Sequence, residues 1–141
     1  MSTKMKKIVP LLIVVLVAIP LLTACGSSSG QGNVNVTLDS FSIQMPSTIK
    51  AGQVTFHVSN VATSDTHSFI VVKTDLAPGK LPLDSTRNVN ESSLDRIGGI
   101  TALAPGASQD LTVTLQPGSY VAYCDLPGHY QAGMFIGFTV Q

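Results

Sequence analysis

The chain has 141 residues, with eight basic and eight acidic side chains and a formal net charge of zero. This length favours one globular domain. Three of the basic residues lie within the first seven positions, so residues 25–141 carry five basic and eight acidic side chains, a formal net charge of −3. A mildly acidic domain without a basic patch excludes nucleic acid as an expected partner.

The first 24 residues are predicted to be an export signal of the lipoprotein type. Lysines near the start precede an apolar run at 8–22, which is too short for a comfortable membrane span. The sequence Leu-Thr-Ala-Cys at 22–25 resembles a bacterial lipobox, in which Cys25 is lipidated and becomes the mature N-terminus. An uncleaved membrane anchor is the alternative. In both cases we expect the domain to be tethered outside the cytoplasmic membrane, in the periplasm or on the outer face of the cell membrane.

Residues 25–32 form a flexible Gly/Ser-rich tether, and the predicted domain spans residues 33–141. Within the domain, apolar and polar residues alternate with a period of two, which is typical of strands with one buried face. The alternating runs lie at 34–38, 54–58 and 111–115, and a continuous apolar run lies at 69–72. Turn signals that contain proline or glycine separate the runs. The pattern predicts an all-β sandwich or barrel, with the continuous run covered on both sides.

One long stretch, 75–104, lacks a clear strand pattern. Within it, residues 91–97 are predicted to form a short helix that ends at Gly98-Gly99. A long excursion of this kind either shapes a partner surface or is a variable connection.

The most informative segment is Cys124-x4-His129-x4-Met134, which lies between predicted strands at 118–124 and 134–140. A thiolate, an imidazole and a weak axial thioether belong to the ligand set that suits copper. Side chains alternate between the faces of a strand, so Cys124 and Met134 can both point into the interior at one end of the sandwich. The segment therefore predicts a copper site that lacks one imidazole.

The missing imidazole must come from another part of the chain. His67 opens the continuous apolar strand after a polar turn, at a strand end from which its side chain can reach the rim of the sandwich, and we predict that it is a ligand. His57 has outward parity in its strand and is predicted to face solvent. Cys124 is an unpaired exported thiol if Cys25 carries lipid, and metal binding or burial would protect it. A Cys25–Cys124 disulfide is the alternative.

Three segments carry a resemblance to a known family. They are Pro46-Ser47-Thr48-Ile49-Lys50-Ala51-Gly52 before a Val-x-Phe strand, His67-Ser68-Phe69, and the closing motifs Tyr-x-x-Tyr-Cys, Pro-Gly-His and Ala-Gly-Met. Over nearly the whole mature domain the chain resembles the cupredoxins, the small blue copper proteins. The resemblance implies a Greek-key β-sandwich of seven to eight strands that holds one copper ion at one end. It implies that His67, Cys124 and His129 bind the ion near one plane, with Met134 as the weak axial ligand.

The resemblance also implies one-electron transfer between redox protein partners through His129, with Leu126, Pro127 and Ala132 in a surrounding apolar patch. Tyr123 has the opposite parity to Cys124 and is expected to face outward. A tyrosine in that position implies a partner-docking surface. The alternative is a tyrosine that only covers the sheet.

Three further residues are expected to surround the ligands. Ser68 stands where the family often has an asparagine that joins the two ligand segments, and a serine makes fewer hydrogen bonds. Asp125 follows the cysteine, and a charged carboxylate close to the thiolate would favour Cu(II). Pro127 lacks an N–H and so removes one possible donor to the sulfur.

Together these features predict a monomeric, mononuclear copper protein that carries single electrons and is not an enzyme. Multicopper oxidases place histidines beside the cysteine, and dinuclear centres need two loop cysteines, whereas here Tyr123 and Asp125 flank a single cysteine. Extracytoplasmic copper binding and delivery is the alternative. A delivery protein needs an open site that releases the metal, whereas a buried set of one thiolate, two imidazoles and a thioether favours retention. A copper-free adhesion sandwich would leave the ligand pattern unexplained.

Overall fold

A computed structural model of the chain describes residues 32–141. The predicted export signal, Cys25 and nearly all of the predicted tether lie outside the described residues. The first strand begins at Gly32, one residue before the predicted start of the domain. Within 32–141 no helix has the length and apolar character needed to cross a membrane.

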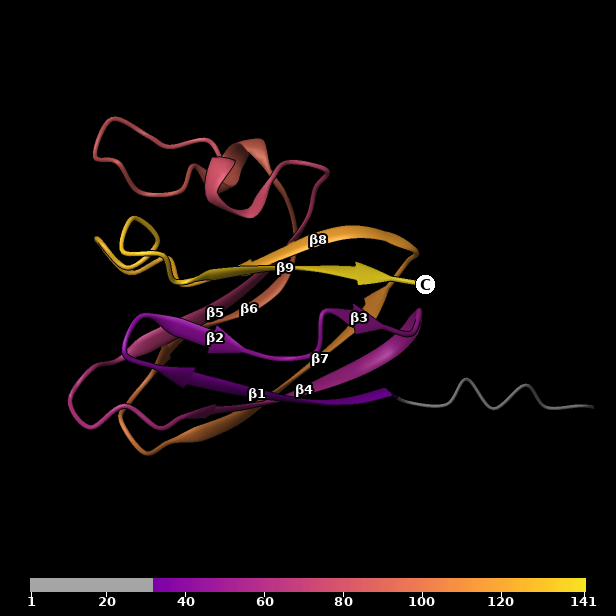
Figure 1. The fold of residues 1–141 in the computed structure, drawn as a ribbon, viewed down its shortest axis with the longest axis horizontal. Coiled ribbons are helices and arrows are strands. Elements are labelled where there is room, and N and C mark those ends of the chain that lie inside the picture. Colours follow the sequence, from indigo (N-terminus) through magenta and orange to yellow (C-terminus); the bar gives the residue numbers. More distant parts are fainter. Residues whose placement is uncertain (1–31) are drawn as a thin grey trace, which may run out of the picture.

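The described residues form two packed β-sheets, which confirms the predicted all-β sandwich (Figure 1). The four-stranded sheet has the order β2 (Ser42–Gln44), β1 (Gly32–Asp39), β4 (Gly52–Asn60) and β7 (Ser108–Leu115). The five-stranded sheet has the order β3 (Thr48–Ile49), β9 (Phe135–Val140), β8 (Gly118–Tyr123), β5 (His67–Lys73) and β6 (Asp95–Leu103). Strands β1 and β4 are parallel, as are β3 and β9, and the other neighbours are antiparallel. The described strands outnumber the seven to eight expected because the stretch before β4 contributes two very short ones.

The period-two pattern explains how the two sheets bury their facing sides. Phe56 of β4 is fully buried, and its ring meets Phe69 of β5 edge-on at 5.4 Å between ring centroids and Phe138 of β9 at 6.3 Å. Edge-to-face contacts of this kind suit the quadrupoles of aromatic rings. The intervening residues of β4 point the other way.

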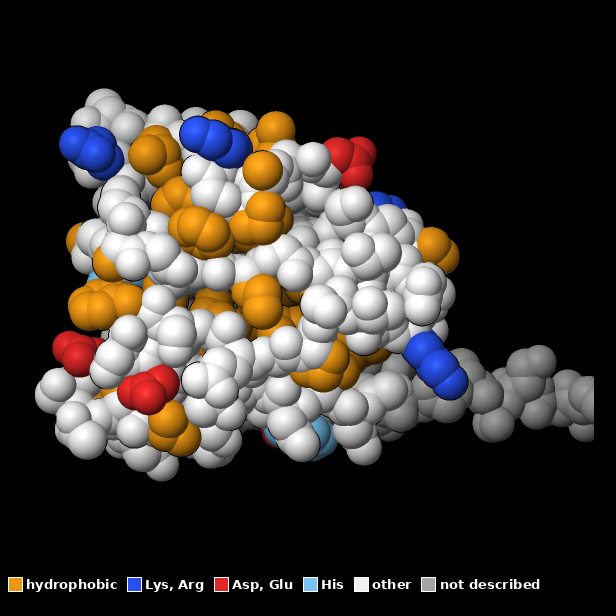
Figure 2. Space-filling model, viewed as in Figure 1, with side chains coloured by type: hydrophobic (Ala, Val, Ile, Leu, Met, Phe, Trp, Pro, Cys, Tyr) orange, Lys and Arg blue, Asp and Glu red, His pale blue; other side chains and the backbone are white. Residues whose placement is uncertain are grey.

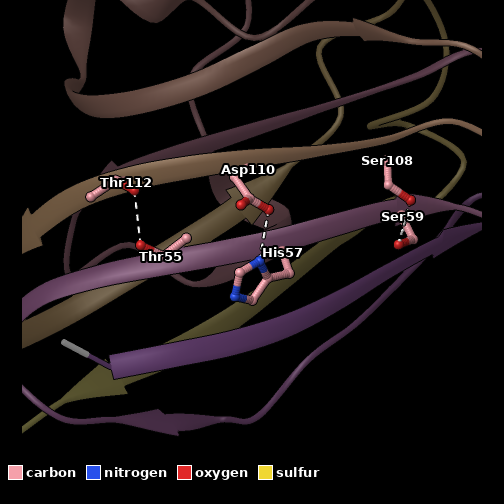
Figure 3. A network of polar contacts seen from close by, with 6 residues as sticks. All are labelled: Thr55, His57, Ser59, Ser108, Asp110 and Thr112. Atoms are coloured by element: carbon pink, nitrogen blue, oxygen red, sulfur yellow. Dashed lines mark hydrogen bonds and ion pairs between the residues drawn. The ribbon is translucent and has the colours of Figure 1, made fainter.

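The outer face of the four-stranded sheet carries a row of polar pairs between β4 and β7 (Figure 3). The pairs are Thr55 with Thr112 at 2.8 Å, His57 with Asp110 at 2.7 Å, and Ser59 with Ser108 at 2.8 Å. Cross-strand polar pairs stabilise a sheet face that borders water. The predicted outward orientation of His57 is confirmed. This histidine lies in the polar row, and among the described residues no hydrogen bond joins it to His67 or His129.

The five-stranded sheet is covered on both faces. One face packs in the sandwich core, and the other packs under the connection between β5 and β6, which lies over the sheet in Figure 1. Ile70, Val72, Val121 and Tyr123 face this connection and form a second apolar layer with it. Burial on both sides explains the continuous apolar run of β5, as predicted.

The predicted helix at 91–97 is wrong, and so is the prediction that the whole 75–104 stretch is irregular. Two 3-10 turns, η1 (Pro78–Lys80) and η2 (Glu91–Ser93), occur in the connection, and strand β6 begins at Asp95. Gly98 and Gly99 lie within β6, where neighbouring side chains leave little room for a Cβ. A Cβ on Gly98 would lie 2.9 Å from Val113 Cγ1, and one on Gly99 would lie 2.5 Å from Ile70 Cδ1. These glycines permit close packing and do not end a helix.

Candidate metal centre

The segment between β8 and β9 is a compact loop closed at its base by a hydrogen bond. The Cys124 N–H donates to the Met134 carbonyl at 3.1 Å, and the Met134 N–H donates to the His129 carbonyl at 3.1 Å. The His129 N–H donates to the Leu126 carbonyl at 3.0 Å. Gly128, with φ 85°, supplies the left-handed turn that this path requires. All three predicted loop ligands are therefore positioned by main-chain hydrogen bonds.

His67 reaches this loop from a distant part of the sequence, because it is the first residue of β5. The ligand atoms of His67, Cys124 and His129 all lie within 4.8 Å of one another. The two Nδ1 atoms are 3.2 Å apart, and Cys124 Sγ lies 3.4 Å from His129 Nδ1. Metal–nitrogen bonds of about 2.0 Å and metal–sulfur bonds of about 2.3 Å place two donors of one ion about 3–4 Å apart. The three donors therefore fit a single ion.

Met134 completes the predicted set from the end of the loop. Its side chain is fully buried, and it belongs to the same apolar cluster as Cys124. Tyr120, Ala122, Phe138 and Val140 share this cluster, which confirms the predicted parity of both flanking strands. The structure thus places Met134 in the interior, in the same cluster as the thiol, and its role as an axial ligand stays a prediction.

Ser68 joins the two ligand segments, even though a serine offers fewer hydrogen bonds than an asparagine. Its N–H and its hydroxyl each donate to Cys124 Sγ at 3.3 Å. Its Oγ accepts a hydrogen bond from the Asp125 N–H at 2.8 Å. Ser68 is fully buried, so water does not compete for these bonds. One residue therefore fixes the sulfur and ties the loop to β5.

The other predicted residues lie around this centre. Leu126 is half-buried against the core, whereas Pro127 and Ala132 are exposed on the loop. Asp125 is half-buried, its Oδ1 has no hydrogen-bond partner among the described residues, and its negative charge helps to raise the pKa of Tyr123. The effects of Asp125 and Pro127 on a bound metal stay predictions.

The predicted docking role of Tyr123 is wrong. Tyr123 does face away from Cys124, but the connection covers it and it is fully buried. Its hydroxyl donates to Glu91 Oε1 at 3.1 Å. Burial first, and then the charge of Glu91, raise the pKa of Tyr123 far above its usual value. A side chain under this cover cannot contact a partner.

Sequence reasoning missed Phe41, in the turn between β1 and β2. Its ring lies edge-on to the His129 ring, 4.9 Å between centroids, and 6.4 Å from that of His67. It is 42% exposed, and its backbone has φ 63°, a left-handed conformation that is unusual for a side chain of this size. An aromatic residue in an otherwise polar turn was the available signal.

Cys124 is a free, buried thiol in the structure. His67 is also fully buried. Burial lowers the pKa of His67 below its usual 6.5, and the neighbouring His129 lowers it further, against the smaller opposite effects of Asp65 and Asp39. A neutral imidazole is the form that binds a metal ion, so the environment favours the ligand state.

Comparison with known proteins identifies the fold. No protein-family model matches the chain, and a search of curated proteins finds no match. Among solved structures, dithionite-reduced auracyanin from Roseiflexus castenholzii is similar with a TM-score of 0.59 and 23% identity, covering 79% of this chain and 98% of that chain. Rusticyanin from Thiobacillus ferrooxidans is similar with a TM-score of 0.59 and 19% identity, covering 77% of this chain and 76% of that chain. Auracyanin B is similar with a TM-score of 0.57 and 21% identity, covering 78% and 88%.

These likenesses show that the chain has the cupredoxin fold. The resemblance inferred from the sequence is confirmed at the level of the fold.

Replacing Ser68 with alanine tests the link between the ligand segments. Ser68→Ala leaves the part-buried Asp125 N–H without its acceptor, so we expect the free energy of unfolding to fall by about 1–3 kcal/mol. Urea denaturation of the copper-free protein measures this change. Ser59→Ala removes a hydroxyl on the exposed sheet face and should change the stability by less than about 0.5 kcal/mol. Equal effects of the two substitutions would contradict the role given to Ser68.

The lowered pKa of His67 predicts a pH dependence. As the pH falls below about 6.5, the unfolded chain binds a proton at this residue before the folded protein does. The copper-free protein should therefore lose stability as the pH falls through this window, until the pH drops below the folded pKa. Urea midpoints at pH 8, 6.5 and 5 measure the effect, and His67→Gln should make the dependence shallower. An identical pH profile in the variant would rule out the assignment.

Proposed function

We propose that this protein is a mononuclear copper protein that carries single electrons between redox partners. The observation that carries the proposal is the convergence of His67, Cys124 and His129, with donor atoms within 4.8 Å of one another. Met134 is buried beside them. A thiolate, two imidazoles and a weak thioether form the donor set of electron-transfer copper sites.

Copper, when bound, supplies the change between Cu(I) and Cu(II). The chain's contribution is to hold its ligands in one arrangement for both states. His67 and Cys124 are fully buried, Ser68 fixes the sulfur with two hydrogen bonds, and the loop is closed by its own main-chain bonds. Rigid ligands need little rearrangement when the charge of the ion changes, which favours fast electron transfer.

The structural neighbours support this proposal. The similar auracyanin structure is described as dithionite-reduced, and a similar rusticyanin structure is described as that of a copper protein. Those descriptions concern the neighbours. For this chain they favour redox chemistry because a thiol and two imidazoles converge within the same fold.

The partner surface is proposed to surround His129. This imidazole is half-buried, whereas the other ligands are fully buried, so it offers the shortest route to the surface. Phe41 lies against it, and Pro127 and Ala132 are exposed on the same loop. Figure 2 shows hydrophobic side chains beside a small area of histidine at this end of the molecule. An apolar surface of this kind suits brief contacts with redox proteins.

Electron transfer fits the site better than an enzymatic reaction does. A substrate must reach the metal, but Cys124, His67 and Met134 are fully buried. We further propose that the protein acts as a monomer, and that lipid on Cys25 anchors it at the outer side of the cytoplasmic membrane. Mass spectrometry of the protein from native membranes tests the anchor.

The thiolate ligand is tested by Cys124→Ser. We expect wild-type protein loaded with Cu(II) to show an intense visible thiolate-to-copper absorption at one ion per chain. The variant should lose this absorption, because a serine oxygen cannot supply the sulfur-to-metal transition. His57→Ala, on the outer sheet face, should keep it. Visible absorption that survives in Cys124→Ser would contradict the proposal. Rapid loss of copper from the wild type to a chelator would support copper delivery instead.

The axial ligand is tested by Met134→Gln. An amide oxygen is a harder donor than a thioether and stabilises Cu(II), so the variant should bind copper with a lower reduction potential. Redox titration against mediators measures the shift. Met45→Gln changes a partly buried methionine outside the loop and should leave the potential near that of the wild type. An unchanged potential in Met134→Gln would show that Met134 is not an axial ligand.

A further inference from the structure

We propose that residues 78–94, named here the clamp segment, hold residues 124–134, named here the metal loop, in place. Tyr130 is the positioning residue that joins the two segments. The inference rests on the proposed function only for its effect on bound copper. The mechanical coupling itself concerns the protein without metal.

The clamp segment and the metal loop are joined through the Tyr130 hydroxyl. Tyr130 directly follows His129, and its side chain is 6% exposed. Its hydroxyl donates to the Pro78 carbonyl at 2.7 Å and accepts a hydrogen bond from the Leu81 N–H at 2.9 Å. Both partners are main-chain groups at the two ends of the turn η1. A buried side chain with both bonds satisfied prevents the residue beside His129 from shifting alone.

Each ligand of the metal loop has an aromatic neighbour in the sequence. Tyr123 precedes Cys124, Tyr130 follows His129, and Phe135 follows Met134. These three rings form one cluster, with centroids 6.0 Å apart for Tyr123 and Tyr130 and 5.1 Å apart for Tyr130 and Phe135. The three ligands thus lie on one side of the chain, and their three neighbours lie together on the other.

This aromatic cluster is the surface on which the clamp segment lies. Leu81, Val89 and Leu94 of the clamp segment pack in the same apolar layer as the cluster. The Tyr123 hydroxyl donates to Glu91 Oε1, and Glu91 Oε2 lies 3.6 Å from Arg96 Nε of β6. The clamp segment is therefore joined to the ligand-bearing chain near both of its ends. Movement of the metal loop requires that these contacts break.

The consequence is that the loop is held at two places. Ser68 of the neighbouring strand β5 holds the sulfur, while Tyr130 holds the His129 side of the loop through the clamp segment. The long connection is then part of the metal centre rather than a variable link between strands.

The chain offers a matched control for Tyr130→Phe. The Tyr120 hydroxyl also makes one donated and one accepted main-chain bond, to the Gln116 carbonyl at 2.7 Å and from the Gln116 N–H at 3.1 Å. Tyr120 is 2% exposed, but it lies in β8 away from the metal loop. Tyr130→Phe and Tyr120→Phe therefore remove the same kind of bonds in different places.

The first readout uses the copper-free protein. Hydrogen exchange is measured at the loop amides of Ala132, Gly133 and Met134, which donate to Gly128, Tyr130 and His129 carbonyls. Relative to exchange through global unfolding in each variant, Tyr130→Phe should speed the exchange of these loop amides about five- to tenfold. Tyr120→Phe should not. Equal exchange in the two variants overturns the proposal. If Tyr130→Phe does not fold, Tyr123→Phe replaces it, with a smaller acceleration expected and the same control.

The second readout uses the copper-loaded protein. Tyr130→Phe should broaden the paramagnetic resonance signal of Cu(II) and slow electron self-exchange several-fold, because His129 samples more positions, while Tyr120→Phe should match the wild type. An unchanged signal and rate would overturn the effect on copper. If the wild type binds no copper while the exchange result holds, the proposed function fails and the coupling stands.

Discussion

The centre depends on the hydrogen bonds through which Ser68 joins the start of β5 to the loop after β8. The Ser68 hydroxyl contacts Cys124 Sγ and accepts the Asp125 N–H, so one side chain places the thiol and positions the loop beside the neighbouring His67. Strands β5 and β8 pair as far as Ile70 and Tyr123, and the Ser68 link extends this registration to His67 and Cys124. The 3.2 Å and 3.4 Å separations among the three donors follow from this registration of β5 against the loop.

The alternation of side chains along the strands then decides which residues face the core and which face the outer layer. On the inner side of the five-stranded sheet, Cys124 and Met134 extend the sandwich core toward its end. On the outer side, Tyr123 and Tyr130 lie in the layer under the 78–94 segment. A sheet buried on both faces resists bending more than a sheet that borders water. His67, Cys124 and Met134 are therefore buried among packed layers, which would limit their movement when the charge of a bound ion changes.

Much of this arrangement could be predicted from the sequence because it depends on local patterns. Period-two alternation predicted the sandwich, and the spacing of Cys124, His129 and Met134 predicted the loop. The missing imidazole then pointed to His67 at a strand end.

Features that depend on contacts between distant parts of the sequence were harder to predict. Parity showed that Tyr123 faces away from Cys124, but not that the connection covers it. In the sequence, Gly98-Gly99 resembles a helix end. The close approach of Val113 and Ile70 shows instead that both glycines permit tight packing within a strand. Phe41 belongs to the site only because the β1–β2 turn lies beside His129.

The central claim is that one copper ion binds where these donors converge. A crystal structure of the copper-loaded protein, with anomalous diffraction at the copper edge, tests it most directly. The account predicts one copper peak per chain, bonded to Cys124 Sγ and to the Nδ1 atoms of His67 and His129, with the loop in the arrangement described here. A main copper peak at the exposed His57 and Asp110, or a coordination sphere without His67, would contradict it.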